Sequence, residues 1–189
     1  MLMMNYICKY KTPDGFEDLV MCGDDETLTG LWFEGSRDDV HEECGCESRE
    51  TPVFRDARRW LDEYFAGRDP DFTPNYRIEG LTPFRQAVID EMLRIPYGAT
   101  VSYGDIARAI AKKRGGRVSA QAVGGAVGWN PICIIIPCHR VIGADGRLTG
   151  YGGGLANKVS LLAQEGVDVV GGICVRRDVL DRIVWDGNG

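Results

Sequence analysis

Apolar residues recur along the first third of the chain in short runs that tight-turn signals separate. The runs within residues 5–35 alternate with the sequences PDG and DDET, a pattern that predicts two or three antiparallel strands. Thr51 and Pro52 then form a helix-start signal, a capping residue followed by proline at the first helical position. Apolar residues at helical spacing continue to Gly67. The pattern therefore predicts a small sheet with one helix, followed by a linker over residues 68–80.

The same helix-start signal opens the second half of the chain. A threonine–proline pair at Thr82 begins an apolar stripe that predicts a helix to about Ile95. Two shorter helices are expected after it, one capped by Ser102 with Asp105 at the capping-box position, and one that begins at Ser119. A basic, glycine-containing loop joins these two helices. Such a pair predicts a helix-turn-helix.

The remaining chain combines a strongly apolar run with glycine-rich turns. The run ICIIIPCHRVIG, residues 132–143, predicts a buried strand, and a turn at residues 144–146 leads into a return segment. Residues 155–165 predict a last amphipathic helix, after which the signal for a further strand is weak. In fold class, the pattern predicts an α+β protein.

Composition excludes several classes of protein. Of the 189 residues, 44% are apolar and 26% charged, as in an ordinary globular protein. No apolar run approaches the roughly 20 residues that a membrane span requires. The first residues, MLMMNYICKYK, lack the apolar core and cleavage site of a signal peptide, so a cytoplasmic protein with no membrane partner is expected. The seven cysteines, odd in number and without a secretory signal, favour free thiols.

Charge is distributed unevenly along the chain. Residues 1–80 hold 9 Lys+Arg against 19 Asp+Glu, net −10, whereas residues 81–189 hold 13 against 9, net +4. Within residues 103–150, seven basic residues stand against two acidic ones. A local basic face can bind phosphate although the whole chain carries a net charge of −6. On charge alone, a solvated loop is a slightly better interpretation than nucleic-acid binding.

Cys138 and His139 form the pair with the clearest chemical meaning. A reactive cysteine needs a nearby base or positive field to become a thiolate, and His139 is one of only two histidines in the chain. Neighbours on an extended strand point to opposite faces, so a direct hydrogen bond between the two requires a break at Pro137. A bridging water is the other route. From these residues alone, a purely structural cysteine is an equally good interpretation.

The sequence around this pair resembles one family. The run IPCHRV, preceded by SAQAVGGAVGWNP and followed by GYGGGLANKVSLLAQEG, resembles the O6-alkylguanine-DNA alkyltransferases, or methylated-DNA–protein-cysteine methyltransferases. The resemblance covers residues 80–168 and is only architectural before them. It implies a ribonuclease-H-like sheet-plus-helix domain over residues 1–78 and a winged helix-turn-helix alkyltransferase domain over residues 79–189.

The resemblance also implies roles for residues at matching positions. Cys138 resembles the alkyl acceptor, His139 the base that acts through a water, and Glu165 the carboxylate that orients this base. Tyr103 resembles the tyrosine that assists nucleotide rotation and gives a proton to the departing guanine, and Asn130 resembles a hinge asparagine. The alkyl pocket would be lined by Tyr151, Val141, Gly152 and Gly153. The DNA contacts would come from Thr82, Arg117, Ala120, Gln121, Ala122, Gly124 and Gly125.

For several of these residues, a simpler interpretation stays open. Without the resemblance, Glu165 is better explained as a solvated residue near a helix end. Tyr103 could be a half-buried aromatic at a helix start, and Asn130 an ordinary helix-ending residue. The helix from Ala120 to Val127 is rich in glycine, which suits close helix packing as well as approach to a DNA groove.

The implied function is DNA repair by stoichiometric alkyl transfer. The alkyl group of an O6-alkylguanine in double-stranded DNA would pass irreversibly to Cys138 after the base is flipped from the duplex. The resemblance implies no cofactor, and a monomer. Two alternatives from other classes stay open: a lesion-binding, alkyltransferase-like protein without transfer activity, and a cysteine hydrolase that uses Cys138 and His139.

Two departures from the family pattern bear on these expectations. Gln121 stands where many members carry an arginine that fills the gap left by the extruded base, and Arg117 could supply the missing charge. Some relatives bind a structural zinc in the N-terminal domain. Here Cys8 and Cys22 are present, but no histidine lies soon after Cys22. His41, Cys44 and Cys46 have poor spacing for tetrahedral zinc, so no metal is expected.

Overall fold

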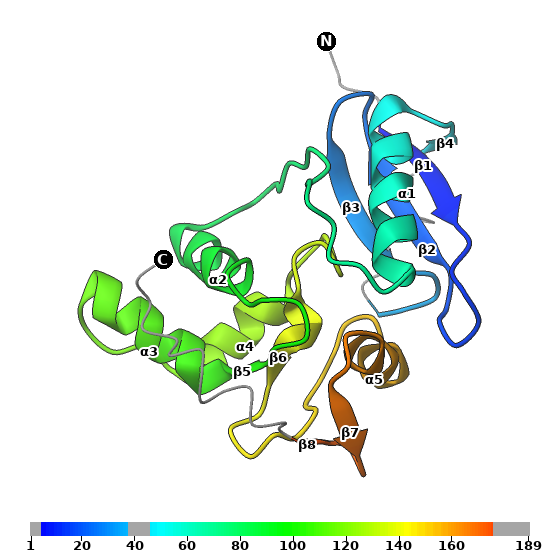
Figure 1. Ribbon diagram of the computed structural model, residues 1–189. Coiled ribbons are helices and arrows are strands. Elements are labelled where there is room, and N and C mark those ends of the chain that lie inside the picture. Colours follow the sequence, from blue (N-terminus) through cyan, green and yellow to red (C-terminus); the bar gives the residue numbers. More distant parts are fainter. Residues whose placement is uncertain (1–4, 38–45, 176–189) are drawn as a thin grey trace.

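Residues 5–37 and 46–175 are described by the structure, a computed structural model (Figure 1). An N-terminal sheet with one helix lies beside a mainly helical C-terminal part, and the predicted α+β class is confirmed. Among the described residues, none of the helices has the length and apolar character that a bilayer crossing requires.

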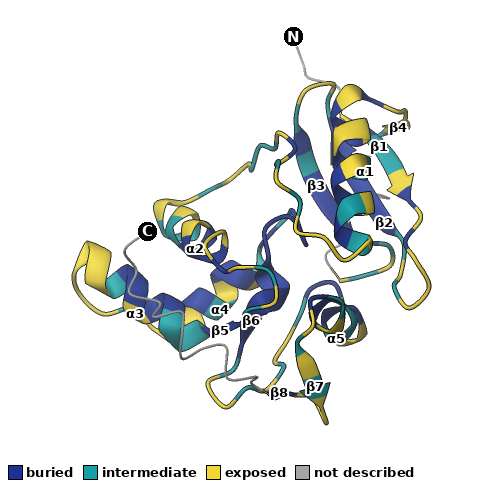
Figure 2. Cartoon of the chain, in the orientation of Figure 1, coloured by how far each residue is buried: buried dark blue, intermediate teal, exposed yellow. Residues whose placement is uncertain are grey.

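The N-terminal sheet has four strands in the order β3-β2-β1-β4. The three antiparallel neighbours confirm the predicted strands, whereas β4 pairs in parallel with β1 and was not predicted. Helix α1 lies across one face of the sheet and buries its apolar side there (Figures 1 and 2). It begins where the sequence predicts, because the Thr51 hydroxyl accepts a hydrogen bond from the Phe54 amide. The elements are β1 (Tyr6–Tyr10), β2 (Leu19–Gly23), β3 (Leu28–Phe33), β4 (Glu47–Ser48) and α1 (Pro52–Phe65).

Three helices follow: α2 (Pro83–Met92), α3 (Tyr103–Arg114) and α4 (Ala120–Gly128). Each starts at its predicted cap, and Ser102 and Asp105 form both hydrogen bonds of the predicted capping box. Helix α2 ends at Met92, three residues before the predicted end. Helices α3 and α4 pack together, as expected for the predicted helix-turn-helix.

The apolar run at residues 132–143 is not the continuous strand that the sequence predicts. Only β6 (Val141–Ile142) is a strand, paired in parallel with β5 (Val101–Ser102). Before it, Ile132 forms a single bridge to Leu31, the chain turns, and the 3-10 turn η2 (Cys138–Arg140) follows. Ile134 has a φ of 66°, in the left-handed region that an extended strand does not contain. The apolar pattern indicated burial correctly but not backbone conformation.

The end of the described chain contains α5 (Leu155–Gln164) and a hairpin of β7 (Asp168–Val170) and β8 (Ile173–Val175). The helix is confirmed, except that Glu165 caps its C-terminus and does not belong to its last turn. The hairpin accounts for the weak strand signal after the helix.

One large apolar core joins the two parts of the molecule, and Ile142, Leu162 and Cys174 form a small second cluster. The Leu31 amide donates to the Pro131 carbonyl at 2.9 Å, and the Cys133 amide donates to the Leu31 carbonyl at 2.9 Å. Strand β3 therefore lies directly against the segment that leads to Cys138. The expectation of free thiols holds for Cys8, Cys22, Cys133, Cys138 and Cys174 but is wrong for Cys46, which is in a disulfide.

No cluster of three or more potential metal ligands occurs within residues 5–37 and 46–175. Of the residues considered for zinc, His41 and Cys44 lie outside the described residues. The expectation that the protein binds no metal therefore stays a prediction.

Candidate active site

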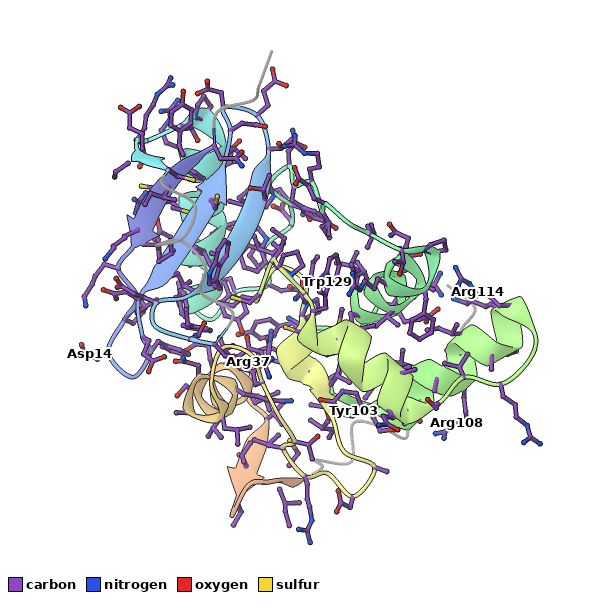
Figure 3. All side chains as sticks on the ribbon, turned by 180° about the vertical axis from the view of Figure 1, so that it is seen from behind. Asp14, Arg37, Tyr103, Arg108, Arg114 and Trp129 are labelled. Atoms are coloured by element: carbon purple, nitrogen blue, oxygen red, sulfur yellow. The ribbon has the colours of Figure 1, made fainter. Side chains whose placement is uncertain are left out.

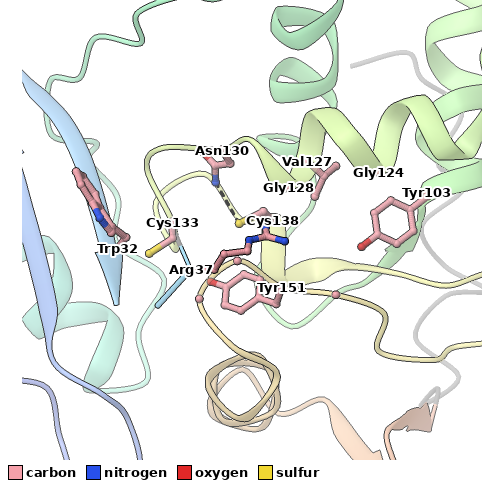
Figure 4. A pocket seen from close by; sticks show the side chains of 13 residues that line it. Trp32, Arg37, Tyr103, Gly124, Val127, Gly128, Asn130, Cys133, Cys138 and Tyr151 are labelled. Carbon is pink, nitrogen blue, oxygen red and sulfur yellow. Dashed lines mark hydrogen bonds between the residues drawn. The ribbon is translucent and has the colours of Figure 1, made fainter. Parts of the chain in front are cut away.

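Cys138 begins η2, and its sulfur faces a cavity. The side chain is 6% exposed, and the cavity has a volume of about 160 Å³. Figure 4 shows Trp32 of β3 at one end of the lining, Tyr103 of α3 at the other, and Cys138 between them. Gly124 and Gly128 of the glycine-rich helix α4 also line it. The thiol is thus buried from bulk water yet open to a space that both parts of the chain enclose.

Asn130 holds the segment that carries this cysteine. Its side-chain amide donates to the Ile136 carbonyl at 2.9 Å and to the Ile132 carbonyl at 3.2 Å, and its carbonyl accepts from the Ile132 amide at 3.1 Å. The same amide donates to Cys138 Sγ at 3.1 Å (Figure 4). Asn130 therefore replaces the missing strand pairing and stabilises negative charge on the sulfur.

Glu165 is the centre of a buried hydrogen-bond network. Its Oε1 lies 2.7 Å from His139 Nε2 and accepts from the Tyr64 hydroxyl at 2.8 Å. Its Oε2 accepts from Arg140 Nε at 2.9 Å and from the Gly98 amide at 3.0 Å. Burial alone would raise the pKa of this carboxyl, but His139 and Arg140 more than offset it and hold the pKa at about 2. The interpretation of Glu165 as a solvated residue is therefore wrong.

His139 is fully buried and neutral at rest. Burial lowers the pKa of the imidazole, and the neighbouring Glu165 carboxylate offsets this only in part. Because Nε2–H donates to the carboxylate, the lone pair is on Nδ1, which makes no hydrogen bond to any described residue. No direct hydrogen bond joins the His139 ring to the Cys138 sulfur in the described part of the chain, although the chain breaks at Pro137 as such a bond requires. The bridging water stays a prediction. The ring can accept a proton at Nδ1.

The Cys138 thiol is protonated at rest. Burial raises its pKa, and the Asn130 amide and the Lys158 ammonium lower it without cancelling that effect. Lys158 is itself fully buried, donates to the Val141 carbonyl at 2.7 Å, and has a pKa that burial lowers to about 8. The Lys158 ammonium and the Asn130 amide would therefore stabilise a Cys138 thiolate, although they do not by themselves deprotonate the thiol.

Two tyrosines, Tyr103 and Tyr151, line the cavity together with Cys138. Tyr103 is half-buried, and its hydroxyl donates to the Thr149 carbonyl at 3.2 Å. The Tyr151 hydroxyl is buried and has no hydrogen-bond partner of ordinary geometry among the described residues. Burial raises the pKa of both phenols, so both stay protonated and can donate. Tyr103 is thus a half-buried aromatic at a helix start, as the simpler interpretation has it, and it also lines the cavity.

The glycines after Tyr151 complete the wall. Gly152 and Gly153 line the cavity, and a Cβ on Gly153 would lie 2.7 Å from the Phe33 ring and 2.8 Å from the Tyr151 ring. Only glycine fits there. Val141, by contrast, is fully buried in the core and does not line the cavity, so the structure gives no support to its expected place in the alkyl pocket.

Of the residues expected to contact DNA, Gly124 lines the cavity and the others lie outside it. Ala120, Gln121, Ala122 and Gly125 are exposed on α4, and Thr82 and Arg117 are exposed as well (Figure 2). Outside the adjacent residues and the backbone of its own helix, no described atom lies within 4 Å of the place where a Cβ of Gly125 would stand. Close packing against another helix therefore does not explain this glycine.

The basic residues of α3 also extend from the surface. Figure 3 shows Arg108 and Arg114 along this helix. Arg108 pairs with Asp105, and Arg114 donates to the Pro83 carbonyl at 2.6 Å. Lys112, Arg114 and Arg117 are all exposed, which agrees with the interpretation of this segment as solvated.

Sequence reasoning missed several residues of the site. Tyr64 reaches Glu165 from α1, and Trp32 and Arg37 line the cavity from the N-terminal part. Arg140 and Lys158 belong to motifs that were recognised, but no role was assigned to them. A local pattern carries no signal for the first three, because each is more than 70 residues from the residue that it approaches.

Comparison with known proteins gives a consistent result. The sequence model of the 6-O-methylguanine DNA methyltransferase ribonuclease-like domain matches residues 5–76, and that of the DNA-binding domain matches residues 83–167. A methylated-DNA–protein-cysteine methyltransferase of Methanosarcina acetivorans is 41% identical over 162 residues, 85% of this chain and 98% of the relative. One from Mycolicibacterium paratuberculosis is 43% identical over 159 residues, 83% of this chain and 92% of the relative.

Solved structures agree with this. The crystal structure of the Mycobacterium tuberculosis O6-methylguanine methyltransferase is 39% identical and superposes with a TM-score of 0.72 over 86% of this chain and 93% of that chain. The Mycobacterium tuberculosis protein in complex with DNA is 39% identical, with a TM-score of 0.70 over 85% of this chain and 92% of that chain.

Proposed function

The chain belongs to the 6-O-methylguanine DNA methyltransferases, and on this premise we propose that Cys138 is its alkyl acceptor and O6-alkylguanine in double-stranded DNA its substrate. It is a DNA-binding repair protein, a methylated-DNA–protein-cysteine methyltransferase that works by single-turnover transfer. One observation carries the proposal: a buried thiol opens on a cavity beside a neutral imidazole that an ionised carboxylate orients.

The first step activates the thiol. The proton of Cys138 passes through a water to Nδ1 of His139, and Glu165 stabilises the imidazolium that forms. The Asn130 amide and the Lys158 ammonium stabilise the thiolate. His139 is suited to this role because burial keeps it neutral until the proton arrives.

The second step transfers the alkyl group. The thiolate attacks the carbon attached to O6 in line, a thioether bond forms, and the bond between that carbon and O6 breaks. Tyr103 donates a proton to the departing guanine, for which its position in the cavity and its protonated state suit it. The thioether is stable, so each molecule acts once and needs no cofactor.

The proposal is tested by the mass of the intact protein after exposure to a duplex that contains O6-methylguanine. Transfer predicts a permanent gain of one methylene, located on the peptide that contains Cys138. An unchanged mass under saturating substrate contradicts transfer and favours a lesion-binding protein without transfer activity.

The rate of transfer is expected to depend on pH through His139. The folded-state pKa of His139 lies below its ordinary value of 6.5, so the ring stays able to accept a proton at neutral pH. The single-turnover rate should therefore hold steady from neutral pH down to 6.5 and fall only in more acidic solution, as the imidazole becomes protonated. Rapid-quench kinetics, with circular dichroism to confirm folding at each pH, measures this. A rate that stays flat through acid argues against imidazole as the base.

Helix α4 is proposed to lie against the DNA. An added methyl group at Gly125 meets no protein atom, so Gly125→Ala should fold and gain about 0.5–1 kcal/mol in free energy of unfolding. If the helix sits close in a groove, the same methyl group should weaken binding to duplex DNA several-fold. Urea denaturation and fluorescence anisotropy measure the two effects. If the dissociation constant for duplex DNA did not change, the DNA would not lie against this part of α4.

Gln121 is proposed to fill the gap left by the flipped base. It is exposed on the first turn of α4, where an arginine side chain has room and would add a charge near phosphate. Gln121→Arg is therefore expected to keep or raise the rate of methyl transfer, measured under single-turnover conditions. A severe loss would show that the glutamine has a different role.

We further propose that residues 1–78 and 79–189 form the two domains, and that the protein acts as a monomer in the cytoplasm. The two family matches, to residues 5–76 and 83–167, support this division. Light scattering of the purified protein tests the monomer.

A further inference from the structure

Tyr64 connects the N-terminal part of the chain to the network around Glu165. It is the last residue but one of α1, its side chain is fully buried, and its hydroxyl donates to Glu165 Oε1 at 2.8 Å. The same oxygen lies 2.7 Å from His139 Nε2, and the tyrosine hydroxyl is 3.4 Å from that nitrogen. Donors from both parts of the chain therefore share one carboxylate oxygen.

The fold holds the Tyr64 hydroxyl in this place. Its ring stacks on that of Trp60, one turn earlier in α1, with the centroids 5.5 Å apart. At the end of the helix, the Gln164 side-chain amide donates to the Phe65 carbonyl at 3.1 Å. Because Gln164 immediately precedes Glu165, this bond fixes the end of α1 beside the carboxylate. The contact between Tyr64 and Glu165 is therefore a consequence of how α1 packs against the end of α5.

Tyr64 can only donate in this contact. Burial and the negative charge of Glu165 raise the pKa of its phenol well above the ordinary value, so the hydroxyl keeps its proton. A hydrogen bond to the ionised form of a carboxylate lowers the affinity of that carboxylate for a proton. Each donor that Oε1 accepts therefore weakens its attraction for the others, and the imidazole N–H of His139 is one of these.

We propose that Tyr64 is a positioning residue for alkyl transfer, which holds the Glu165 oxygen toward His139 and limits how strongly that oxygen attracts the imidazole proton. The inference rests on the activation of Cys138 proposed above. In that step the thiol proton passes through a water to Nδ1, and the imidazolium keeps its other proton on Nε2, beside Oε1. Because the Tyr64 hydroxyl also binds Oε1, this proton stays on the nitrogen. The bonds that form and break in the transfer itself are unchanged.

The C-terminal part also places charged or titratable groups around the imidazole or the Tyr64 ring: Glu165, Arg140, Lys158 and Tyr97. Glu165 favours the charged imidazole, whereas the positive charges of Arg140 and Lys158 disfavour it. Tyr97 stays neutral, because burial raises the pKa of its phenol. Removal of the Tyr64 hydroxyl leaves all of these charges in place, so its effect on the imidazole can be measured separately.

Tyr64→Phe tests the inference through the pH dependence of transfer. The variant keeps the ring, and Glu165 Oε1 still has its contacts with His139 and with Arg140 Nη2 at 3.0 Å, so the protein should fold. With one donor fewer, the oxygen attracts the imidazole proton more strongly and stabilises the imidazolium. The fall of the single-turnover rate in acid should therefore occur at a pH higher by about 0.5–1 unit than in the wild type. Circular dichroism confirms folding at each pH.

The hydrogen bond itself gives a second readout that needs no DNA. The proton on His139 Nε2 donates to a buried carboxylate, so it should give a separate downfield resonance in the NMR spectrum of the resting protein. Without the competing hydroxyl, the bond from Nε2 to Oε1 strengthens, and this resonance should move further downfield in Tyr64→Phe. A purely structural role predicts the opposite, because looser packing would weaken the bond and move the resonance upfield.

Two control variants separate the hydroxyl from its surroundings. Tyr10→Phe is the matched control, because Tyr10 is also buried and its hydroxyl also donates to a carboxylate, that of Asp62, at 2.8 Å. Trp60→Phe changes the ring that stacks on Tyr64 but keeps the Tyr64 hydroxyl. Neither control should change the rate profile or the resonance.

The inference is overturned if either readout of Tyr64→Phe matches the wild type, or if Trp60→Phe shifts both readouts as far as Tyr64→Phe does. Failure of the wild type to transfer a methyl group would overturn the proposed function instead. The NMR comparison would still report on the contact between Tyr64 and Glu165 in that case, because it requires no substrate.

Discussion

Cys138→Ser is expected to bind alkylated duplex DNA but to transfer nothing to itself. A serine hydroxyl is far less acidic than a thiol and a much weaker nucleophile toward an alkyl carbon, and a neutral imidazole cannot compensate for that difference. The substituted residue keeps its place in the cavity beside Asn130, so the fold and the DNA-binding surface should persist. Intact-protein mass spectrometry after exposure to O6-methylguanine DNA should show no added methylene, and gel-shift titration should show a dissociation constant near that of the wild type.

Cys22→Ser supplies the matched control. Cys22 is also a buried free thiol whose pKa burial raises, but it lies in β2 and does not line the cavity. The control should gain one methylene, as the wild type does. If Cys138→Ser still gained a methylene, or if Cys22→Ser gained none, the assignment of Cys138 as the acceptor would be wrong. Repeated release of product by the wild type would point to the cysteine hydrolase instead, since a transferase that ends as a thioether cannot turn over.

Glu165→Gln is expected to lower the free energy of unfolding by about 3–5 kcal/mol. The glutamine has nearly the same shape, but it leaves the buried Arg140 guanidinium without its counter-charge and replaces the carboxylate that His139 contacts at 2.7 Å. Urea denaturation at neutral pH measures the loss. The transfer rate should fall as well, because the imidazolium formed during activation loses its stabilising charge.

The same substitution should remove part of the acid sensitivity of the protein. The pKa of Glu165 is about 2 in the folded protein against an ordinary 4.5, a difference equivalent to about 3 kcal/mol. Because the folded-state pKa is the lower one, this stabilisation is fully present above pH 4.5 and is lost as the pH falls toward 2. The wild type should therefore lose stability across this window more steeply than the variant.

Glu50→Gln is the control for both measurements. Glu50 pairs with Arg58 at 3.3 Å, but both side chains are partly exposed, and such surface pairs contribute only about 0–1 kcal/mol. Its effect on unfolding should be small. If both variants lost the same free energy of unfolding, the buried network around Glu165 would contribute no more to stability than a surface ion pair.

Where the helices begin could be predicted from the sequence, because a cap acts within four residues. The hydroxyl groups of Thr51, Thr82, Ser102 and Ser119 each accept the amide three positions on, as the local pattern indicated. Chemistry was also readable at Cys138 and His139, because reactive side chains stand next to each other in a recognisable motif.

The conformation around Cys138 could not be predicted in the same way. An apolar run indicates burial but does not distinguish a strand from a sequence of turns. The Asn130 side chain stabilises the turns, because it makes the hydrogen bonds with the backbone of Ile132 and Ile136 that a neighbouring strand would otherwise make. The break places His139 against Glu165 and away from the sulfur.

By itself, the sequence determined the α+β class and the helix caps, and its resemblance to one family pointed to Cys138 as the nucleophile, since these depend on short-range patterns along the chain. Only the tertiary structure decided the protonation states of the site residues and which distant residues line the cavity. The pKa of Glu165 falls because His139 and Arg140 converge on it, and that of His139 falls because packing excludes water. Trp32 reaches the cavity because β3 pairs with a segment 100 residues further along the chain. Burial and the convergence of distant residues are properties of the packed chain. They set the protonation states of the residues that the motif contains.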